Sequence, residues 1–236
     1  MAKLEGRHIL LTGISRGVGL ETARLFLAEG AQLFGVGKDA NRLELVRKEL
    51  DPTGRRLAVL AADLASPDAA RKIADAVSRH WPKLDILLNN AGIQIDAGAR
   101  GFTDGTEAAL TQSMEVNLMA PYRLALALLP MLKAGVEPRI INVSSGAGTF
   151  AAMKDERIAS YRLSKWALNG FTLLLSAELA GQVAVNAFDP GWVKTDLGGP
   201  NAPGSPTESA QGALAIATLP FSESGKFWKD GKEIPF

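Results

Sequence analysis

The stretch His8-Ile9-Leu10-Leu11-Thr12-Gly13-Ile14-Ser15-Arg16-Gly17-Val18-Gly19 decides the fold. A short apolar run enters a glycine-rich turn, and a helical pattern follows over residues 18–27. Glycines let the backbone approach a pyrophosphate closely, and a helix N-terminus supplies N–H donors and a positive dipole. The sequence therefore predicts a dinucleotide-binding turn. Its Gly-x-x-x-Gly-x-Gly spacing differs from the Gly-x-Gly-x-x-Gly fingerprint, so an ordinary glycine turn stays open as the alternative.

Strand-like and helical patterns alternate along the rest of the chain. Helices are expected over residues 41–50, from Ser66-Pro67 onward, over about 102–133 with a kink near Pro121, and over about 158–180. Apolar runs lie between them at 32–36, 57–60, 85–88, 139–143 and 183–188. Buried strands that alternate with helices predict a parallel sheet covered on both faces. We therefore expect an α/β fold with a Rossmann-type doubly wound parallel sheet, in a single domain over residues 1–236.

The composition argues against several other functions. The 236 residues carry a net charge of +1, which provides no global field for nucleic acid or an anionic membrane. The chain has no Cys and only two His, His8 and His80, so thiolate chemistry is excluded and no metal site is expected. Its charged N-terminus precedes an apolar run too short for a signal peptide or a membrane span. We expect a soluble, cytoplasmic protein.

One Gly- and Pro-rich stretch stands apart from the alternating pattern. It runs from Thr195 to Pro206, follows a strand and offers few side chains for packing. Loops beyond the carboxyl ends of parallel strands bind ligands in such sheets. We predict a substrate lid over about residues 194–210, with a flexible connection as the alternative. Farther along, residues 225–234 predict a short edge strand with an Asp-Gly turn.

Tyr161 and Lys165 are spaced for proton chemistry. Side chains four residues apart on a helix share one face, with Cβ atoms about 5–6 Å apart. An ammonium stabilises a neighbouring phenolate, so we expect the pKa of Tyr161 to fall below its usual value of about 10. A tyrosine tuned in this way can donate or accept a proton near neutral pH. The alternative is a half-buried Tyr beside a solvated Lys, without chemistry.

These landmarks together resemble the short-chain dehydrogenase/reductase family in its single-domain type. The match covers nearly the whole chain, in order and on the expected elements. Its motifs are Thr12–Gly19, Asp63-Leu64, Asn89-Asn90-Ala91-Gly92, Asn117 within 115–118, Ser144-Ser145, Tyr161–Lys165 and Pro190–Thr195. The lid and the C-terminal segment resemble the carbonyl-reductase-like branch, which implies an NAD(P)-dependent oxidoreductase acting on a small carbonyl or alcohol.

The resemblance also implies roles for the matching residues. Tyr161 would be the general acid/base, and Lys165 would lower its pKa and hold the nicotinamide ribose. Ser145 would orient the substrate oxygen, with Ser144 as the alternative. Asn117 would kink its helix and hold a water of the proton relay, and Asp63 would accept from the adenine amine. Further cofactor contacts would come from Gly13, Ser15, Arg16, Gly17, Val18, Leu64, Asn90, Ala91, Gly92, Pro190, Gly191, Val193 and Thr195.

The chain departs from the family pattern in one segment. The connection from Ser145 to Tyr161 is a few residues longer than usual and carries the polar run Lys154-Asp155-Glu156-Arg157. We expect a surface loop there, at the mouth of the pocket or at a subunit contact. Nearby Phe150 and Met153, together with Trp192, are candidates to line an apolar pocket or to be structural.

The residues after the second strand favour NADPH over NADH. An NAD enzyme usually places a carboxylate there, which binds the ribose 2′-OH and repels a 2′-phosphate. Here the position falls at Gly37, with Lys38 next to it, and Arg16 adds a second cation near the same phosphate. A one-residue shift of the strand end would instead bring the acid Asp39 into play.

We therefore predict an NADPH-dependent carbonyl reductase, reversible, in which Tyr161 delivers the proton to an aldehyde or ketone. Two other functions stay open: an NADP(H)-binding redox sensor or signalling protein with little turnover, and a nucleotide-sugar epimerase or dehydratase. The latter normally needs an added substrate domain, for which the chain has no room. The apolar faces of the helices near 102–133 and 158–180 favour a homodimer or homotetramer, unless they belong to the core.

Overall fold

The architecture is that of one sheet between two layers of helices. The structure, a computed structural model, describes residues 2–96, 98 and 100–236. In that part of the chain eight strands follow the order β3-β2-β1-β4-β5-β6-β7-β8. β1 to β7 pair in parallel, and β8 pairs antiparallel with β7. The strands are β1 (His8–Thr12), β2 (Gln32–Gly37), β3 (Leu57–Ala61), β4 (Ile86–Asn89), β5 (Arg139–Val143), β6 (Ala184–Phe188), β7 (Phe227–Lys229) and β8 (Lys232–Ile234).

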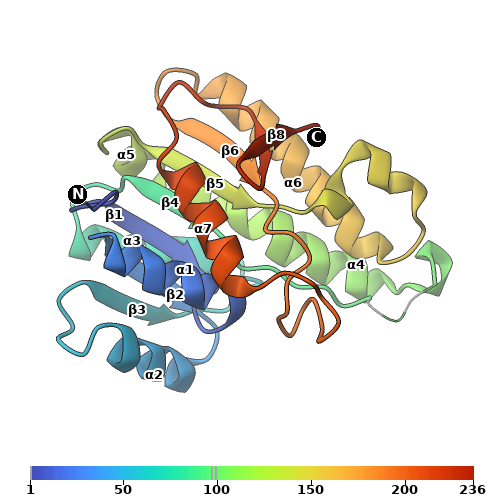
Figure 1. Cartoon of the computed structure of the whole chain (residues 1–236), viewed down its shortest axis with the longest axis horizontal. Coiled ribbons are helices and arrows are strands. Elements are labelled where there is room, and N and C mark those ends of the chain that lie inside the picture. Colours follow the sequence, from blue (N-terminus) through green and yellow to red (C-terminus); the bar gives the residue numbers. More distant parts are fainter. Residues whose placement is uncertain (1, 97, 99) are drawn as a thin grey trace.

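Both faces of the sheet carry an apolar core, because neighbouring strand residues point to opposite faces. Ile9 and Leu11 pack with α1, α2 and α7, whereas Leu10 packs with α3, α5 and α6. Figure 1 shows α1 and α7 in front of the sheet and α5 and α6 behind it. The predicted doubly wound α/β fold is thereby confirmed. The helices are α1 (Gly17–Ala28), α2 (Ala40–Leu50), α3 (Ala69–His80), α4 (Glu107–Met114), α5 (Ala120–Lys133), α6 (Ala159–Glu178) and α7 (Pro206–Ala217).

The long helix expected over about 102–133 is divided into parts. A 3₁₀ turn covers Phe102–Asp104, α4 follows, and α5 begins only at Ala120. Between α4 and α5, Glu115–Met119 form a π-helical turn, so the distortion precedes Pro121. Pro121 has no N–H to donate to the carbonyl of Asn117, so the regular α-helical hydrogen-bond pattern is interrupted there.

The helix expected to start at Ser66-Pro67 starts later. α3 begins at Ala69, and Asp68 precedes its first turn. The Ser66 hydroxyl donates to Asp68 Oδ1 at 2.6 Å, and the Ser66 carbonyl accepts from the N–H of Ala69 at 3.1 Å. Ser66 therefore builds a turn before the helix and is not its N-cap.

The Gly- and Pro-rich stretch is packed more tightly than its composition indicated, and the predicted lid of about residues 194–210 includes the start of a helix. α7 already begins at Pro206, where Ser205 and Glu208 form a capping box. In the loop itself, Val193 and Gly204 form a β-bridge, and the Trp192 indole donates to the Gly198 carbonyl at 2.7 Å. Residues 190–205, between β6 and α7 (Figure 1), are called the lid loop below, after the role predicted for them.

The C-terminal segment supplies two strands where one edge strand was expected. β7 extends the parallel sheet beside β6, and β8 returns as a hairpin around Asp230-Gly231. Both turn residues have positive φ angles, 49° and 73°, as a two-residue type I′ turn requires. The Asp-Gly turn itself is therefore confirmed.

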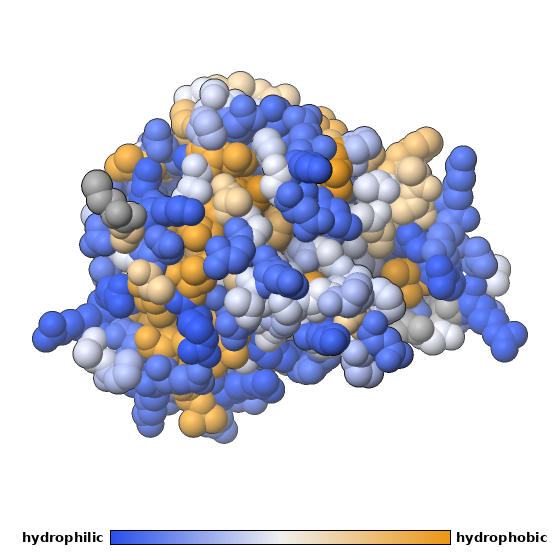
Figure 2. All heavy atoms as spheres, in the orientation of Figure 1, coloured by the Kyte–Doolittle hydropathy of each residue, from blue (hydrophilic) through white to orange (hydrophobic). Residues whose placement is uncertain are grey.

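The visible surface is mainly hydrophilic. Figure 2 shows hydrophobic residues in patches between hydrophilic ones on the face seen in Figure 1. None of the described helices combines the length and the apolar character needed to cross a bilayer.

Candidate active site

The predicted site residues gather at the carboxyl edge of the sheet. β1, β4, β5 and β6 are parallel neighbours in register, so the segments that leave their carboxyl ends meet there. Because the chain turns back between β3 and β4, β1 and β4 form the switch point of the sheet, where doubly wound folds bind ligands. The segments that follow these strands contain the glycine turn, Asn90–Gly92, Ser144-Ser145 and Pro190–Thr195.

The three glycines of the turn have no room for a side chain. A Cβ at Gly13 would lie 2.9 Å from Asn90 Nδ2, and one at Gly19 would lie 2.1 Å from the Gly13 carbonyl oxygen. Gly17 has a φ of 57° and lies against the Thr195 methyl, which a Cβ would approach to 2.9 Å. The turn, with Ser15, Arg16 and Val18 on it, therefore exposes backbone at the N-terminus of α1, which fits a pyrophosphate.

Asn90 shapes this turn. Its amide Nδ2 donates to the carbonyls of Thr12 at 2.8 Å and Gly13 at 3.3 Å. The Thr12 hydroxyl in turn accepts from the N–H groups of Asn90 and Ala91, both at 3.0 Å. Sequence reasoning assigned Thr12 no role of its own, although a hydroxyl at the end of an apolar strand was a visible signal.

The end of the site beside β2 is rich in cations. β2 ends at Gly37, one residue beyond the predicted run 32–36, and the Asp39 carboxylate caps α2 by accepting from the N–H groups of residues 41 and 42. Lys38 Nζ lies 2.8 Å from Asp63 Oδ2, just before Leu64. Arg16 pairs with Asp196 of the lid loop.

Arg42 belongs to the same end of the site and was missed by the sequence analysis. Its Nε donates to the Ser15 carbonyl at 2.9 Å, so a third guanidinium or ammonium group lies beside the glycine turn. Its only sequence signal was its place in the first turn of α2. The Asp39 cap makes this arrangement possible, because it starts α2 directly after the strand.

The side chains of Tyr161 and Lys165 lie close together on α6. The Lys165 ammonium lies 5.8 Å from the centre of the Tyr161 ring and donates to the Val143 carbonyl at 2.7 Å. A Cβ at Gly92 would lie 3.4 Å from both Lys165 Nζ and Asn117 Oδ1. The glycine therefore leaves space beside the pair that a side chain would occupy.

The expected lowering of the Tyr161 pKa is wrong for this structure. Burial raises the pKa of Tyr161 to about 12, Asp189 adds to the rise, and a hydrogen bond with Ser145 opposes it. Burial also lowers the pKa of Lys165 to about 8, which Asp189 opposes. The low dielectric of the interior disfavours both charged forms, and this effect exceeds the attraction that the sequence spacing indicated.

The two serines have different surroundings. The Ser145 hydroxyl accepts from the N–H of Ala147 at 3.1 Å and interacts with Tyr161. The Ser144 hydroxyl is buried and donates to the backbone carbonyl of Lys165 at 3.4 Å. Ser145 is therefore the serine that faces the phenol.

The Asn117 side chain is fully buried and occupied by protein partners. Its Oδ1 accepts from the Ile93 N–H, and its Nδ2 donates to the Ile93 carbonyl and the Ser164 hydroxyl, all at 2.9 Å. The Ser164 hydroxyl donates to the Tyr161 carbonyl at 2.7 Å. The Asn117 side chain thus ties the segment after β4 to α6. The kink that was expected at Asn117 is the π-helical turn around it.

Asp189 is a buried carboxylate that sequence reasoning missed, although it directly precedes Pro190-Gly191. Its oxygens accept from the Gly191 N–H at 2.9 Å and pair with Lys229 at 3.1 Å. A Cβ at Gly146 would come within 3.0 Å of it, so the carboxylate lies beneath the turn that follows Ser145. The described residues contain no cluster of His, Cys, Asp or Glu side chains suited to a metal ion.

The remaining predicted cofactor contacts belong to the lid loop. Pro190 accepts from the Ser209 hydroxyl at 2.8 Å, Gly191 has a φ of 81°, and Val193 is buried. Phe150 and Trp192, two candidates for an apolar pocket, are exposed by 71% and 60%, while Met153 is partly buried.

Comparison with known proteins agrees with this geometry. A family model described as short chain dehydrogenase matches residues 7–205. (+)-Neomenthol dehydrogenase of Arabidopsis thaliana is 29% identical over 95% of each chain, and C-signal of Myxococcus xanthus is 36% identical over 65% of this chain and 93% of its own. An NADPH-bound carbonyl reductase from chicken fatty liver superimposes with a TM-score of 0.88 at 30% identity, covering 99% of this chain and 100% of its own. The chain belongs to the short-chain dehydrogenase/reductase family and is an NAD(P)-dependent oxidoreductase.

Proposed function

We propose that the protein is an NADPH-dependent carbonyl reductase that converts an aldehyde or ketone to an alcohol, reversibly. The observation that carries this proposal is the convergence of Tyr161, Lys165 and Ser145 at the carboxyl edge of the sheet, beside the glycine turn. The likeness to an NADPH-bound carbonyl reductase supports the same activity.

Each group has a distinct task in the proposed reaction. Bound NADPH would supply the hydride. Tyr161 donates its phenolic proton to the carbonyl oxygen, and a pKa of about 12 keeps that proton in place at neutral pH. Ser145 shares the charge that develops on the same oxygen. Lys165, held by the Val143 carbonyl, presents its ammonium to the cofactor ribose.

The charges near the glycine turn support NADPH over NADH. Lys38, Arg16 and Arg42 lie around the end of β2. Of the acids nearby, Asp39 is engaged as a helix cap, and Asp63 and Asp196 pair with Lys38 and Arg16. Asp63 would accept from the adenine amine once Lys38 turns to the 2′-phosphate. Asn90, Ala91, Gly92, Val193 and Thr195 would complete the cofactor floor.

The surroundings of the site support a substrate with an apolar body. Large apolar side chains are exposed on three segments that leave the carboxyl edge: Ile95 after β4, Phe150 after β5, and Trp192 and Leu197 after β6. Their exposure in three neighbouring loops favours an aromatic or branched aliphatic ketone. The lid loop 190–205 would close over it.

The test is turnover by wild type and Tyr161→Phe with NADPH and a panel of aromatic aldehydes, diketones, quinones and keto esters, followed by nicotinamide absorbance. Tyr161→Phe should retain NADPH affinity and lose at least about 100-fold in kcat, the lower end of the range for general acid catalysis. Tyr122→Phe is the matched control, because Tyr122 is the other tyrosine of the chain and is partly exposed on α5. An active Tyr161→Phe enzyme would refute the assigned roles.

A second candidate is an NADP(H)-binding redox sensor or signalling protein. The similarity to C-signal favours it, and the intact set of Asn117, Ser145, Tyr161 and Lys165 opposes it. Wild type that binds NADPH and reduces no compound of the panel would support this second function. For either function we propose a cytoplasmic location and a homodimer or homotetramer.

A further inference from the structure

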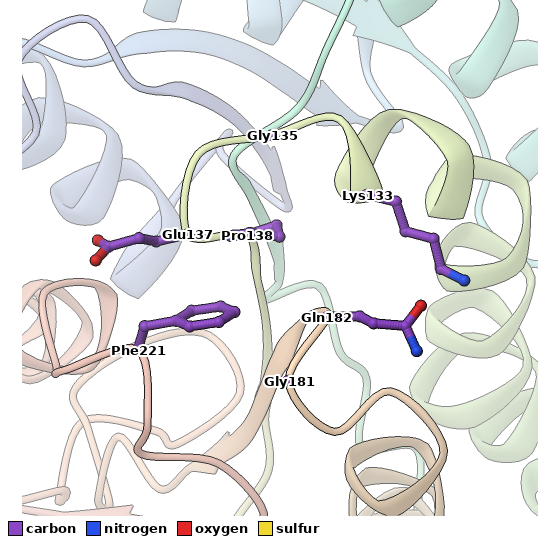
Figure 3. A pocket seen from close by; sticks show the side chains of 7 residues that line it. All are labelled: Lys133, Gly135, Glu137, Pro138, Gly181, Gln182 and Phe221. Atoms are coloured by element: carbon purple, nitrogen blue, oxygen red, sulfur yellow. The ribbon is translucent and has the colours of Figure 1, made fainter.

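Two hollows lie beside the segments that lead into β5 and β6, at the opposite edge of the sheet from the site. The hollow in Figure 3 opens at the amino-terminal edge of the sheet, between residues 133–138 and 181–182. Its carboxylate, Glu137, is already paired with Arg7 at 3.0 Å and Arg139 at 3.6 Å. Arg162, by contrast, directly follows the proposed proton donor, Tyr161. It is a buried cation that the proposed mechanism does not use.

The Arg162 guanidinium binds several groups of the unusually long connection between Ser145 and Tyr161. Its Nε donates to the Arg157 carbonyl at 2.8 Å, and Nη1 donates to the carbonyls of Ala152 at 3.1 Å and Ala147 at 3.4 Å. Its Nη2 pairs with Asp155 at 2.5 Å. One planar guanidinium thus holds three carbonyls and one carboxylate of a single segment, which the point charge of a lysine cannot do.

The ends of this segment carry the two groups that must meet the substrate oxygen. Ser145 begins the segment, and its hydroxyl accepts from the N–H of Ala147, whose carbonyl is bound by Arg162. At the other end, Arg162 directly follows Tyr161 on α6. Residues 146–157 also press on the same helix, since Gly148 packs on the Lys165 backbone and binds Asn169 at 3.0 Å. Within residues 145–157 the described hydrogen bonds join residues two or three positions apart, so none of them spans the loop.

We propose that Arg162 is a positioning residue that fixes Ser145 relative to Tyr161 across the inserted loop. It touches neither substrate nor cofactor and acts through the carbonyls of the loop. The polar run Lys154–Arg157, unexplained by the family pattern, then has a purpose, because it brings the Asp155 carboxylate and the Arg157 carbonyl to the guanidinium. The inference rests on the proposed reductase function only for its kinetic consequence.

The chain offers a matched control. Arg157 also pairs with Asp155, at 2.7 Å, but its side chain is 73% exposed, whereas that of Arg162 is 11% exposed. Arg157→Ala removes an arginine from the same carboxylate without touching the carbonyl contacts. Arg162→Lys keeps the positive charge and loses the planar set of N–H donors, and Arg162→Met removes both.

Amide hydrogen exchange tests the anchoring without any turnover. Exchange in residues 146–157 should quicken at least tenfold in Arg162→Lys and stay within twofold of wild type in Arg157→Ala. This result stands even if the protein reduces nothing, so it separates the inference from the proposed function. Equal exchange in wild type, Arg162→Lys and Arg157→Ala would overturn the anchoring.

Single-turnover reduction at saturating NADPH tests the consequence. Arg162→Lys should lower the rate about 10- to 100-fold, as expected for misplaced catalytic groups, while NADPH affinity stays within threefold of wild type. In a Ser145→Ala background the same substitution should cost less than threefold, because the group that it positions is already absent. A full-sized loss in that background would show that Arg162 acts elsewhere and would overturn the inference. If Arg162→Met fails to fold, Arg162→Lys and Asp155→Asn serve for both the hydrogen-exchange and the single-turnover measurements.

Discussion

Among single residues, Lys165 combines a buried side chain with an ammonium charge. Its side chain is buried, and its pKa is lowered from 10.5 to about 8. Below pH 8 the ammonium is charged in the folded and the unfolded state, and the folded state carries the full cost of burying it. Between pH 8 and 10.5 the folded protein releases this proton while the unfolded chain keeps it, so stability must rise with pH.

We expect this rise to be absent from Lys165→Met. From pH 7 to pH 10 the free energy of unfolding of wild type should increase by roughly 2 kcal/mol relative to the variant, since each pKa unit corresponds to about 1.4 kcal/mol. Urea unfolding at several pH values measures the difference. Parallel pH profiles of the two proteins would contradict the buried, charged lysine.

Cofactor preference is also decided by single side chains. Lys38 and Arg16 are exposed and paired with the carboxylates of Asp63 and Asp196, so both can turn toward a 2′-phosphate. In the double variant Lys38→Ala, Arg16→Ala, the ratio of kcat/KM for NADPH to that for NADH should fall about tenfold or more, because hydrogen bonds to charged groups contribute about 1.5–3 kcal/mol. Lys48→Ala, an exposed lysine of α2 that pairs with Glu44, should leave the ratio unchanged. A preference for NADPH that survives in the double variant would refute the assignment.

Among the elements, α6 is notable for how it starts. The residue before its first turn, Ile158, has the left-handed angles φ 50° and ψ 42°, which are costly for a β-branched side chain, and it provides no side-chain cap. The cap comes from far along the chain: Asp96 Oδ2 accepts from the Ser160 N–H at 2.7 Å. This carboxylate also faces the positive end of the helix dipole, one residue before Tyr161.

Asp96→Ala should therefore destabilise the protein by about 1 kcal/mol, the usual cost of losing a helix N-cap. Asp96→Asn should lose much less, because an amide oxygen can accept the same bond. Thermal unfolding of the three proteins compares them. Equal destabilisation by Ala and Asn would mean that the charge, rather than the acceptor, is what α6 requires.

At the scale of the whole molecule, α5 and α6 leave apolar side chains uncovered. Tyr122 and Leu126 of α5, with Trp166, Leu173 and Leu174 of α6, are all at least 41% exposed. Exposed apolar side chains gathered on neighbouring helices are typical of a protein–protein interface, so we expect a second copy of the chain to cover them. This expectation corresponds to the oligomer predicted from the sequence.

Leu174→Glu should shift the protein toward monomer, because it would place a carboxylate in that interface. Sedimentation velocity of wild type and variant measures the shift. Leu45→Glu is the control, since Leu45 is similarly exposed, at 67% against 74%, but lies on α2. A wild type that is monomeric at all concentrations would contradict the interface.

The sequence by itself determined those features of this protein that depend on neighbours along the chain. The alternation of strands and helices and the Asp-Gly turn before β8 both follow from local patterns. The same holds for the shared face of Tyr161 and Lys165, because helical geometry fixes residues four apart. Local preferences are written in adjacent residues, so they are readable without a structure.

Only the tertiary structure decided the environment of those residues. It turned the expected fall of the Tyr161 pKa into a rise, because burial depends on what packs around the ring. It placed the Asn117 side chain in hydrogen bonds with the Ile93 backbone, and it brought Asp96 to the N–H of Ser160, 64 residues away. It also folded the inserted loop around Arg162. Partners that are distant in sequence and the low dielectric of the interior both arise from packing, which no spacing along the chain records.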